Sequence, residues 1–362
     1  MRALRFHASE RSLRIDAAAP VPSPAPGEAL IRPHRLGVTA TERAIVAGAL
    51  APHFSGILGH EFVGTVESIN LPADPPPTLR DKQALKGRRV VASPIIACGA
   101  CDMCRAGLSQ HCRSRAVVGL SGRDGVFAER ICLPLSNLQP VPETVPDDQA
   151  ILAYSLVRAA HAAQFARAAA RGFITVLADP VGDPTLALLI AQVLALSNRS
   201  TRLLSSNPAA LGVCERWGLK HRPIEEAGRR QDQDAVVVCS ASPAPLRTAM
   251  QMVRPRGTIV MASPTLLEPL PPGRPFPEVA PGSPGAAAML DLAPLMVGEI
   301  SLIGCRDGPA TASALAEALT LLAPGGGIDA ASLIARRVKF DDAPAALTAA
   351  APHDHLGLAI EL

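Results

Sequence analysis

The sequence predicts an α/β protein of two domains, in which a small β-barrel is followed by a doubly wound parallel sheet. The first observation behind this fold class is the length. A chain of 362 residues exceeds the size at which a single hydrophobic core usually stops growing, so two cores are expected. The second is a change of pattern, from short strand-like runs before residue 145 to buried runs that alternate with helical stretches after residue 171.

The first domain is expected to be a barrel because its apolar runs are short and separated by turns. Strand-like runs fall at 28–32, 61–69 and 88–93, with proline and glycine between them. The chain ends in a helix rich in alanine and leucine and a short strand-like tail, which we assign back to this domain. The predicted domains are 1–150 together with 305–362, and 151–304.

The second domain is expected to be a parallel sheet because buried strand-like runs alternate with helical ones. FITVLA at 173–178 is followed by the helical run LALLIAQVLAL at 186–196, and DAVVVCS at 234–240 is a later strand. The run ISLIGC at 300–305 is expected to be the last strand of the sheet. Residues 264–284 are dense in proline and glycine, which predicts a loop.

Composition and charge indicate a globular protein of the cytoplasm. Hydrophobic residues make up 48% of the chain and charged residues 19%, and the net charge is +3. The arginines are scattered, so no nucleic-acid partner is expected. The start MRALRFHASE lacks the apolar run of a secretion signal, and the apolar stretch at 186–196 is far shorter than a membrane span.

The most specific local pattern is a group of four cysteines, C-x2-C-x2-C-x7-C, which consists of Cys98, Cys101, Cys104 and Cys112. Four thiolates in one short loop can close a tetrahedron around zinc and leave no open position for chemistry. We therefore expect one structural zinc ion per chain. Free buried thiols and an iron–sulfur cluster are the alternatives. A nucleic-acid-binding zinc ribbon fits less well, because ribbons usually have two separated C-x2-C pairs.

Several further motifs accompany the cysteines: LGHEFVGTVESI at 58–69, KGRRVV at 86–91, DGVFAERICLP at 124–134 and VRPRGTIVMAS at 253–263. Together they make the sequence resemble, from end to end, the zinc-containing alcohol dehydrogenases among the medium-chain dehydrogenases/reductases. The resemblance implies a GroES-like catalytic domain, a Rossmann nucleotide-binding domain and hydride exchange between NAD(P)(H) and a small-molecule substrate. It also implies a homodimer or homotetramer.

The sequence departs from this family at the catalytic zinc. In the family this ion is held by a cysteine, by the histidine of a GHE motif and by a later carboxylate or cysteine. Here Thr39 stands at the cysteine position and Tyr154 at the later one, while His60 is present with Glu61 beside it. Neutral hydroxyl groups are poor zinc ligands. We therefore expect no tightly held catalytic zinc.

The residues left for proton transfer are Thr41, His60 and Tyr154. Thr41 takes the position of the hydroxyl that relays protons in the family, and Glu42 replaces the usual acidic neighbour. Tyr154, the only tyrosine of the chain, could donate a proton to a substrate oxygen. Hydrogen-bonded burial of His60 and simple packing of Tyr154 would also explain these two residues.

The nucleotide-binding motif is altered as well. The best match to G-x-G-x-x-G is GDPTLA, in which Gly182 and Ala187 fit and Pro184 replaces the second glycine. An alternative register takes 178–183 as the turn. Proline removes a donor N–H, which predicts weakened binding of the cofactor diphosphate.

The choice of cofactor is predicted from the end of the second strand. TRLLSSN has no acidic residue there, and Ser205 stands at the position that would contact the ribose, with Arg202 and Asn207 nearby. This favours NADP(H) over NAD(H). Arg306, just after the last strand, lies where relatives often approach the cofactor, although an ordinary solvated arginine would explain it equally well.

Three functions remain open. The favoured one is an NAD(P)(H)-dependent oxidoreductase that acts without catalytic zinc on a carbonyl, an alcohol or an activated double bond. The second is an ordinary zinc alcohol dehydrogenase whose ligands come from other positions. The third is a non-catalytic scaffold or binding protein that keeps the fold and the structural zinc. The fold alone does not decide between them.

Overall fold

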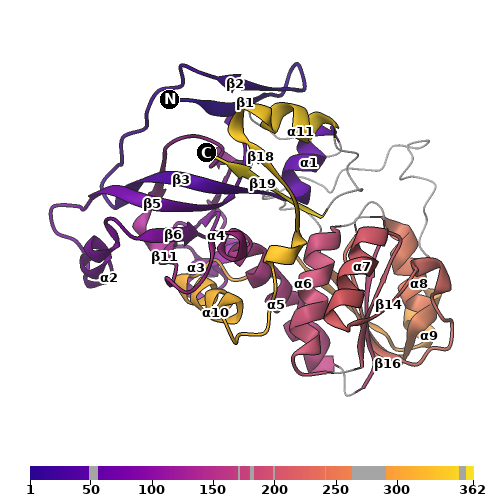
Figure 1. The fold of residues 1–362 in the computed structure, drawn as a ribbon. Coiled ribbons are helices and arrows are strands. Elements are labelled where there is room, and N and C mark those ends of the chain that lie inside the picture. Colours follow the sequence, from indigo (N-terminus) through magenta and orange to yellow (C-terminus); the bar gives the residue numbers. More distant parts are fainter. Residues whose placement is uncertain are drawn as a thin grey trace. The chain divides into compact units, whose positions relative to one another are not determined.

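The computed structural model forms two compact units and describes residues 1–48, 56–169, 172–179, 183–198, 200–240, 242–262, 291–349 and 356–362. The first unit consists of Met1–His161 and Asp307–Leu362, and the second of Ala162–Arg306 (Figure 1). The predicted class, an α/β protein with a barrel-like unit and a parallel-sheet unit, is confirmed. The loop predicted at 264–284 lies outside the described residues.

The first unit is built on a mainly antiparallel sheet of seven strands. Six follow the order β11-β6-β5-β3-β19-β18, and β10 also pairs with β3. The C-terminal strand β19 pairs with β3, with Leu358 opposite Val38. The strands of this sheet are β3 (Glu28–Val38), β5 (Glu61–Asn70), β6 (Arg89–Ala92), β10 (Ile131–Pro134), β11 (Leu138–Pro140), β18 (Ile334–Lys339) and β19 (Gly357–Glu361).

Two smaller sheets and short helices complete the first unit. One sheet joins β2 (Ser12–Asp16), β1 (Ala3–His7) and β4 (Gly56–Ile57), and the other joins β7 (Ile95–Ile96), β8 (Ala116–Val118) and β9 (Gly122–Arg123). The α-helices are α1 (Ala40–Val46), α2 (Pro77–Arg80), α3 (Asp102–Arg105), α4 (Asp147–Ala150), α10 (Ala312–Leu322) and α11 (Ala343–Ala349), and α5 (Ala153–Ala169) begins in this unit and continues into the second. Single 3-10 turns are η1 (Asp81–Leu85), η2 (Ser109–His111), η3 (Leu135–Asn137), η5 (Ala331–Leu333) and η6 (Phe340–Asp342).

Two features of this unit place His60 and Glu61. Strand β3 pairs with β5 so that Gly37 lies opposite Glu61, which brings the start of α1 next to the GHE motif. Gly59 precedes His60 with φ +93°, and a Cβ atom there would lie 2.1 Å from the ring of Phe127. Only glycine fits such a conformation at such a close approach. The chain therefore enters β5 through a turn that a larger residue would disrupt.

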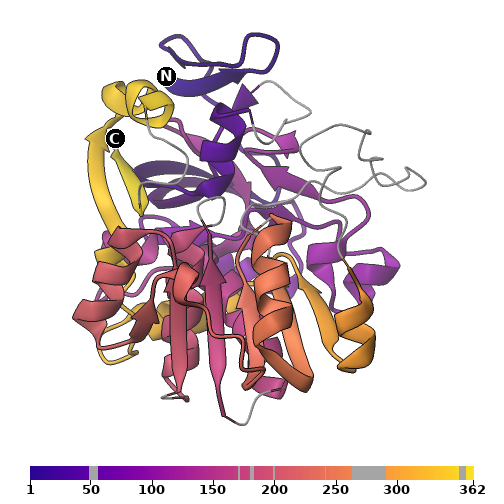
Figure 2. The same ribbon diagram turned by 90° about the vertical axis from the view of Figure 1, so that its right-hand side faces the viewer.

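The second unit is a six-stranded parallel sheet in the order β14-β13-β12-β15-β16-β17. Helix α6 packs on β12 and β13, α7 on β13 and β14, and α8 on β15 and β16 (Figure 2). The strands are β12 (Ile174–Ala178), β13 (Thr201–Ser205), β14 (Lys220–Arg222), β15 (Gln233–Val238), β16 (Val253–Ala262) and β17 (Ser301–Cys305). The helices are α6 (Pro184–Ala195), α7 (Pro208–Trp217), η4 (Ile224–Glu226), α8 (Pro243–Met252) and α9 (Ala293–Val297).

This strand order reverses direction between β12 and β15, where an open parallel sheet usually binds its ligand beyond the carboxyl ends of the strands. Every residue of the central strand β12 is buried, whereas most residues of the edge strands β14 and β17 are exposed or partly exposed. The run ISLIGC contributes β17 at the sheet edge, as predicted. Within the described residues, no helix combines the length and the apolar character needed to cross a bilayer.

Candidate functional site

The four cysteines of the first unit converge. The Sγ atoms of Cys101 and Cys104 lie 3.5 Å apart, those of Cys101 and Cys112 3.9 Å, and those of Cys98 and Cys104 4.0 Å. A zinc ion about 2.3 Å from each of four tetrahedral sulfurs would place the sulfurs roughly 3.8 Å apart. The lobe therefore has the donor type and the spacing of a closed structural zinc site.

The surroundings act unequally on the thiols of the lobe, because burial raises the pKa of Cys104 to about 12. The backbone N–H groups of Arg113 and Cys104 lower the pKa of Cys101 to about 6. Arg113 also forms a two-pronged ion pair with Asp102, with N–O distances of 2.9 and 2.7 Å, which ties the two ends of the lobe together. Cys101 thus favours the thiolate form that binds metal.

A second group of polar residues gathers at the start of α1. Thr39 is the N-cap of this helix, and its hydroxyl accepts a hydrogen bond from the backbone N–H of Thr41. Both the backbone N–H and the hydroxyl of Thr39 donate to Oε2 of Glu42, at 2.9 and 2.7 Å. This is a capping box, in which the N3 carboxylate reaches back to the N-cap. Thr41 is itself buried as the second residue of the helix.

The other oxygen of the same carboxylate holds His60. Glu42 Oε1 lies 2.6 Å from Nδ1 of His60, and both side chains are 2% exposed. Within the described residues, Nε2 of His60 has no hydrogen-bond partner. One carboxylate thus caps α1 and orients an imidazole whose second nitrogen is left available.

The electrostatics of this pair favour the charged forms of both groups. Burial alone would lower the pKa of His60, but the Glu42 carboxylate raises it above its ordinary value, with a smaller contribution from Glu61. Burial alone would raise the pKa of Glu42, but His60 and the hydrogen bonds from Thr39 lower it below its ordinary value. The buried pair therefore favours the form with a charged imidazolium and a charged carboxylate.

Glu61 behaves differently from Glu42. Burial raises the pKa of Glu61 to about 7, although His60 and the Ser155 side chain favour its charged form. The carboxyl group is 2% exposed. Two adjacent carboxyl groups in one site thus have pKa values pushed in opposite directions, a pattern often found in proton-transfer sites.

Tyr154 lies near this group at the start of α5. Its side chain is 2% exposed, and its hydroxyl has no hydrogen-bond partner within the described part of the chain. Burial, together with the Asp307 and Glu61 carboxylates, raises the pKa of Tyr154 well above its ordinary value, while Arg158 opposes the shift. The phenol therefore stays protonated and can donate a proton or a hydrogen bond.

Arg158 connects the members of this site. It lies four residues after Tyr154 on α5, hence on the same helix face, and it is 2% exposed. Its positive charge acts on His60, Glu61 and Tyr154. Asp307, which begins the second segment of the first unit, is 3% exposed and also acts on Tyr154. Sequence reasoning named neither Arg158 nor Asp307.

The candidate nucleotide-binding residues lie in the second unit. Gly182 is outside the described residues. Pro184 is the first residue of α6 and Ala187 is fully buried in its first turn. The N-cap of α6 is Asp183, whose Oδ1 accepts a hydrogen bond of 3.0 Å from the backbone N–H of Leu186. A carboxylate therefore already occupies the end of the helix where a dinucleotide diphosphate would bind.

Ser205 is the last residue of β13 and is 1% exposed. Its hydroxyl accepts a hydrogen bond from the backbone N–H of Asn207, which in turn caps α7. Arg202 does not join them, because its Nε donates to Thr175 near the amino end of β12. Arg306 is half-buried directly after β17.

Residues 25–143 match the alcohol dehydrogenase GroES-like domain. The chain is 30% identical over 224 residues to an L-threonine 3-dehydrogenase of Mesorhizobium japonicum, a stretch that covers 60% of each chain. It is 32% identical over 165 residues to that of a Chelativorans species, which covers 46% of this chain and 44% of the relative. The chain thus spans less than two thirds of the length of these relatives.

Solved structures share the whole fold. A protein described as a zinc-binding dehydrogenase from Sinorhizobium meliloti, bound to NADP, matches with a TM-score of 0.76 at 21% identity over 100% of this chain and 99% of the other. Galactitol-1-phosphate dehydrogenase from Escherichia coli matches with a TM-score of 0.80 at 18% identity over the full length of both. At these identities the likeness shows the fold alone.

Proposed function

We propose that this chain is a member of the alcohol dehydrogenase-like family of medium-chain dehydrogenases/reductases, which its partial matches favour, and that it is an NAD(P)(H)-dependent oxidoreductase that works without catalytic zinc. Its substrate is a small carbonyl compound, an alcohol or an activated double bond. One zinc ion per chain serves the four-cysteine lobe. The Glu42–His60 dyad and Tyr154 take over proton transfer in the first unit.

The observation that carries this proposal is the role of Thr39, which stands at the position where the family has a cysteine ligand of the catalytic zinc. The Thr39 hydroxyl caps α1 and donates to Glu42, so it is committed to the local fold. The phenol of Tyr154 is held neutral by burial. Among the described residues, His, Cys, Asp and Glu side chains are grouped closely enough to hold a metal ion only in the four-cysteine lobe, so the surroundings of His60 are a poor fit to a tightly held tetrahedral zinc.

The remaining groups suit proton transfer. Reduction of a carbonyl group needs a proton at the oxygen, and both the Tyr154 phenol and the His60 imidazolium can supply one. After a transfer, the neutral His60 takes up a proton from solvent, and the Glu42 carboxylate favours this step because it stabilises the imidazolium. Arg158 adds a buried positive charge near the position where negative charge would develop on a substrate oxygen.

The hydride, when the nicotinamide cofactor is bound, comes from or goes to that cofactor. The parallel sheet and its switch point fit a dinucleotide, and solved structures of this fold are described with NADP in one case and NADH in another. The buried Ser205, at the end of a strand without an acidic residue there, favours NADP(H). Asp183 disfavours tight binding of either cofactor.

Metal analysis combined with turnover tests the proposal. Protein purified without added metal is expected to contain one zinc per chain, which Cys101→Ser loses and His60→Ala keeps. NADPH oxidation with a panel of small aldehydes and ketones is expected to survive a chelator that spares the structural zinc. Two zinc ions per chain, one of them lost in His60→Ala together with the activity, would instead identify an ordinary zinc alcohol dehydrogenase.

The Asp183 cap also favours a second candidate, a non-catalytic scaffold, because it opposes the diphosphate of any nicotinamide cofactor. A titration followed by nicotinamide fluorescence separates the two functions. The oxidoreductase is expected to bind NADPH at least as tightly as NADH, whereas a scaffold binds neither.

A further inference from the structure

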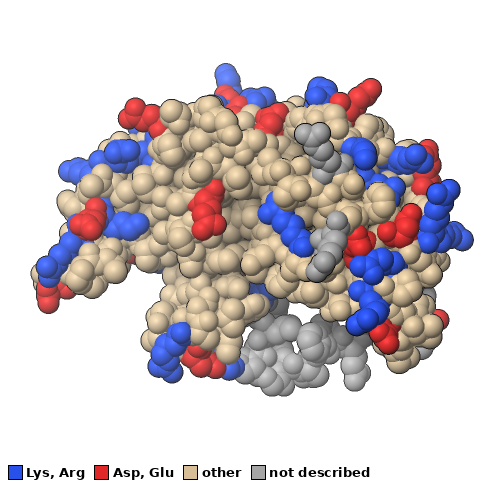
Figure 3. Space-filling model, turned by 90° about the horizontal axis from the view of Figure 1, so that it is seen from below, with Lys and Arg blue, Asp and Glu red and all other residues tan. Residues whose placement is uncertain are grey.

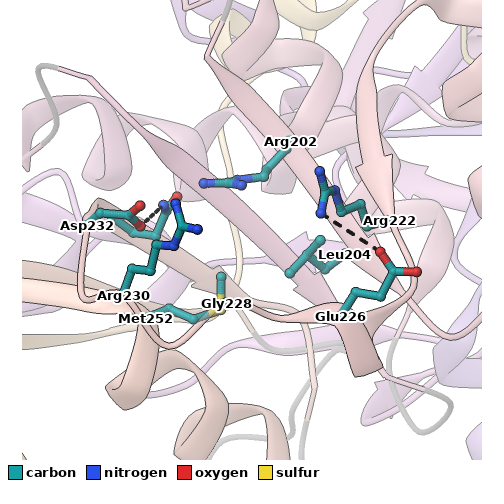
Figure 4. A pocket seen from close by; sticks show the side chains of 9 residues that line it. Arg202, Leu204, Arg222, Glu226, Gly228, Arg230, Asp232 and Met252 are labelled. Atoms are coloured by element: carbon teal, nitrogen blue, oxygen red, sulfur yellow. Dashed lines mark hydrogen bonds and ion pairs between the residues drawn. The ribbon is translucent and has the colours of Figure 1, made fainter.

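The second unit contains a pocket that the proposed function does not use (Figure 4). It encloses about 270 Å³. Its polar walls are three arginines, Arg202, Arg222 and Arg230, together with Glu226 and Asp232. Leu204 and Met252, which belong to the core packed under α8, form its apolar floor.

The location separates this pocket from the candidate cofactor site. Arg202 is the second residue of β13, and Gln233, which also lines the pocket, is the first residue of β15. The pocket therefore begins at the amino ends of β13 and β15 and runs along the sheet as far as Leu204 and Arg222, without reaching the last residue of β13. A dinucleotide binds beyond the opposite, carboxyl ends of parallel strands.

A buried hydrogen-bond relay fixes Arg202 in the pocket wall. Its Nε donates to Thr175 at 3.0 Å, the Thr175 hydroxyl donates to Oε1 of Gln233 at 2.7 Å, and Nε2 of Gln233 donates to Asp232 at 2.5 Å. Thr175 is 0% exposed and Gln233 is 1% exposed. The hydrogen bond to Thr175 orients the guanidinium, and within the described residues no hydrogen bond engages its two terminal nitrogens, which extend into the pocket (Figure 4).

The two other arginines stand at the rim. Arg222 faces Glu226 across 3.9 Å, and both side chains are more than half exposed. Such an exposed ion pair contributes little to stability, so Arg222 can leave Glu226 and bind a ligand instead. Arg230 lies on the opposite side of Arg202, next to Asp232 (Figure 4). Three guanidinium groups against two carboxylates leave the pocket with a positive charge.

We propose that this pocket binds a small phosphate monoester. A phosphate carries nearly two negative charges and three oxygens, which suits guanidinium groups that approach from several directions better than a planar carboxylate does. The apolar floor of Leu204 and Met252 would accommodate the carbon part of the ester. The site is independent of the oxidoreductase function and stands even if that function fails.

The test uses the full-length protein and isothermal titration calorimetry with sn-glycerol 3-phosphate, inorganic phosphate and glycerol. Glycerol 3-phosphate is expected to bind saturably with one site per chain, more tightly than inorganic phosphate, while glycerol gives no heat. Loss of a charge-assisted bond in Arg202→Met should weaken binding by roughly 10-fold or more. NADPH should not compete, because it belongs to the other edge of the sheet.

Matched variants make the outcome decisive. Arg247→Met removes an exposed arginine of α8 outside the pocket and should leave binding unchanged, which controls for net charge. If Arg202→Met does not fold, the exposed rim variant Arg230→Met replaces it and should also weaken binding. The proposal is overturned if glycerol 3-phosphate gives no saturable binding, or if the pocket variants bind as tightly as Arg247→Met.

Discussion

Asp183→Asn should strengthen the binding of nicotinamide cofactors. Asp183 is 4% exposed and accepts the backbone N–H of Leu186 at the first turn of α6. Asparagine caps a helix about as well as aspartate, so the substitution removes the negative charge and preserves the cap. Loss of the favourable charge–dipole interaction should cost about 0.5 kcal/mol of stability, which leaves the fold intact.

The magnitude follows from the position of the charge. A diphosphate bound to the N–H groups at this helix end would place a phosphate roughly 5 Å from the Asp183 carboxylate. At an effective dielectric constant of about 20, two like charges at that distance repel by about 3 kcal/mol. Ionic screening at an open sheet edge reduces this figure to about 1.5 kcal/mol. The dissociation constant for NADPH should therefore fall about 10-fold, since 1.4 kcal/mol corresponds to a factor of 10.

The assay is a fluorescence titration with NADPH and NADH, repeated by calorimetry with ADP-ribose, which has the diphosphate but no nicotinamide. The affinity of the Asp183→Asn variant for all three ligands should rise by a similar factor, because the three ligands share the diphosphate. Glu215→Gln removes one negative charge from the exposed side of α7 and should change none of the affinities. Equal affinities of the native protein and a folded Asp183→Asn variant would refute the argument that this carboxylate opposes the diphosphate.

Three further predictions concern the first unit. Tyr154→Phe keeps the ring and removes the proton donor, so turnover should slow by roughly 10²–10⁴-fold with an unchanged melting temperature; full activity would eliminate the phenol. The pKa of Glu61 is raised from 4.5 to about 7, so its contribution to stability is complete below about pH 4.5 and is lost as the pH rises through 7. This amounts to about 3 kcal/mol, at 1.36 kcal/mol for each unit. Denaturant titrations should show that the free energy of unfolding falls over this pH range, and the fall should be smaller in Glu61→Gln. The same pH dependence in both proteins would contradict the raised pKa of Glu61. Gly59→Ala should lower the melting temperature markedly, because its Cβ would lie 2.1 Å from the Phe127 ring at φ +93°; a native melting temperature would show that the turn can adjust.

The architecture could be predicted from the sequence because each unit has its own pattern of buried residues. The lengths of individual strands could not, because they depend on how the strands pair. The run at 28–32 was cut at Pro33, whereas β3 continues to Val38. Proline is tolerated there because the pairing with β5 shifts register between Pro33 and Arg35, so the missing N–H falls at an irregularity of the ladder. No local sequence pattern predicts such a register shift.

The candidate site was predictable only in part, for the same reason. Thr39 and Glu42 form a T-x-x-E capping pattern that the sequence displays, and Arg158 follows Tyr154 at the helical spacing of four. The bond from Glu42 to His60 was not visible, because it depends on Gly37 pairing with Glu61 across two strands. Asp307 comes from a segment about 150 residues beyond Tyr154, and only the tertiary fold brings the two together.

The capping box explains why threonine at position 39 has a structural consequence beyond the loss of a thiolate. Thr39 satisfies the first turn of α1 through its hydroxyl and also fixes Glu42 through two hydrogen bonds. A cysteine at this position would be a poor helix cap, because sulfur is a weak hydrogen-bond acceptor. It would therefore loosen the carboxylate that orients His60. Position 39 can therefore hold either a cysteine that binds a metal ion or a threonine that supports the Glu42–His60 pair, but not both. The proton-transfer chemistry of the site is thus linked to the N-cap of α1.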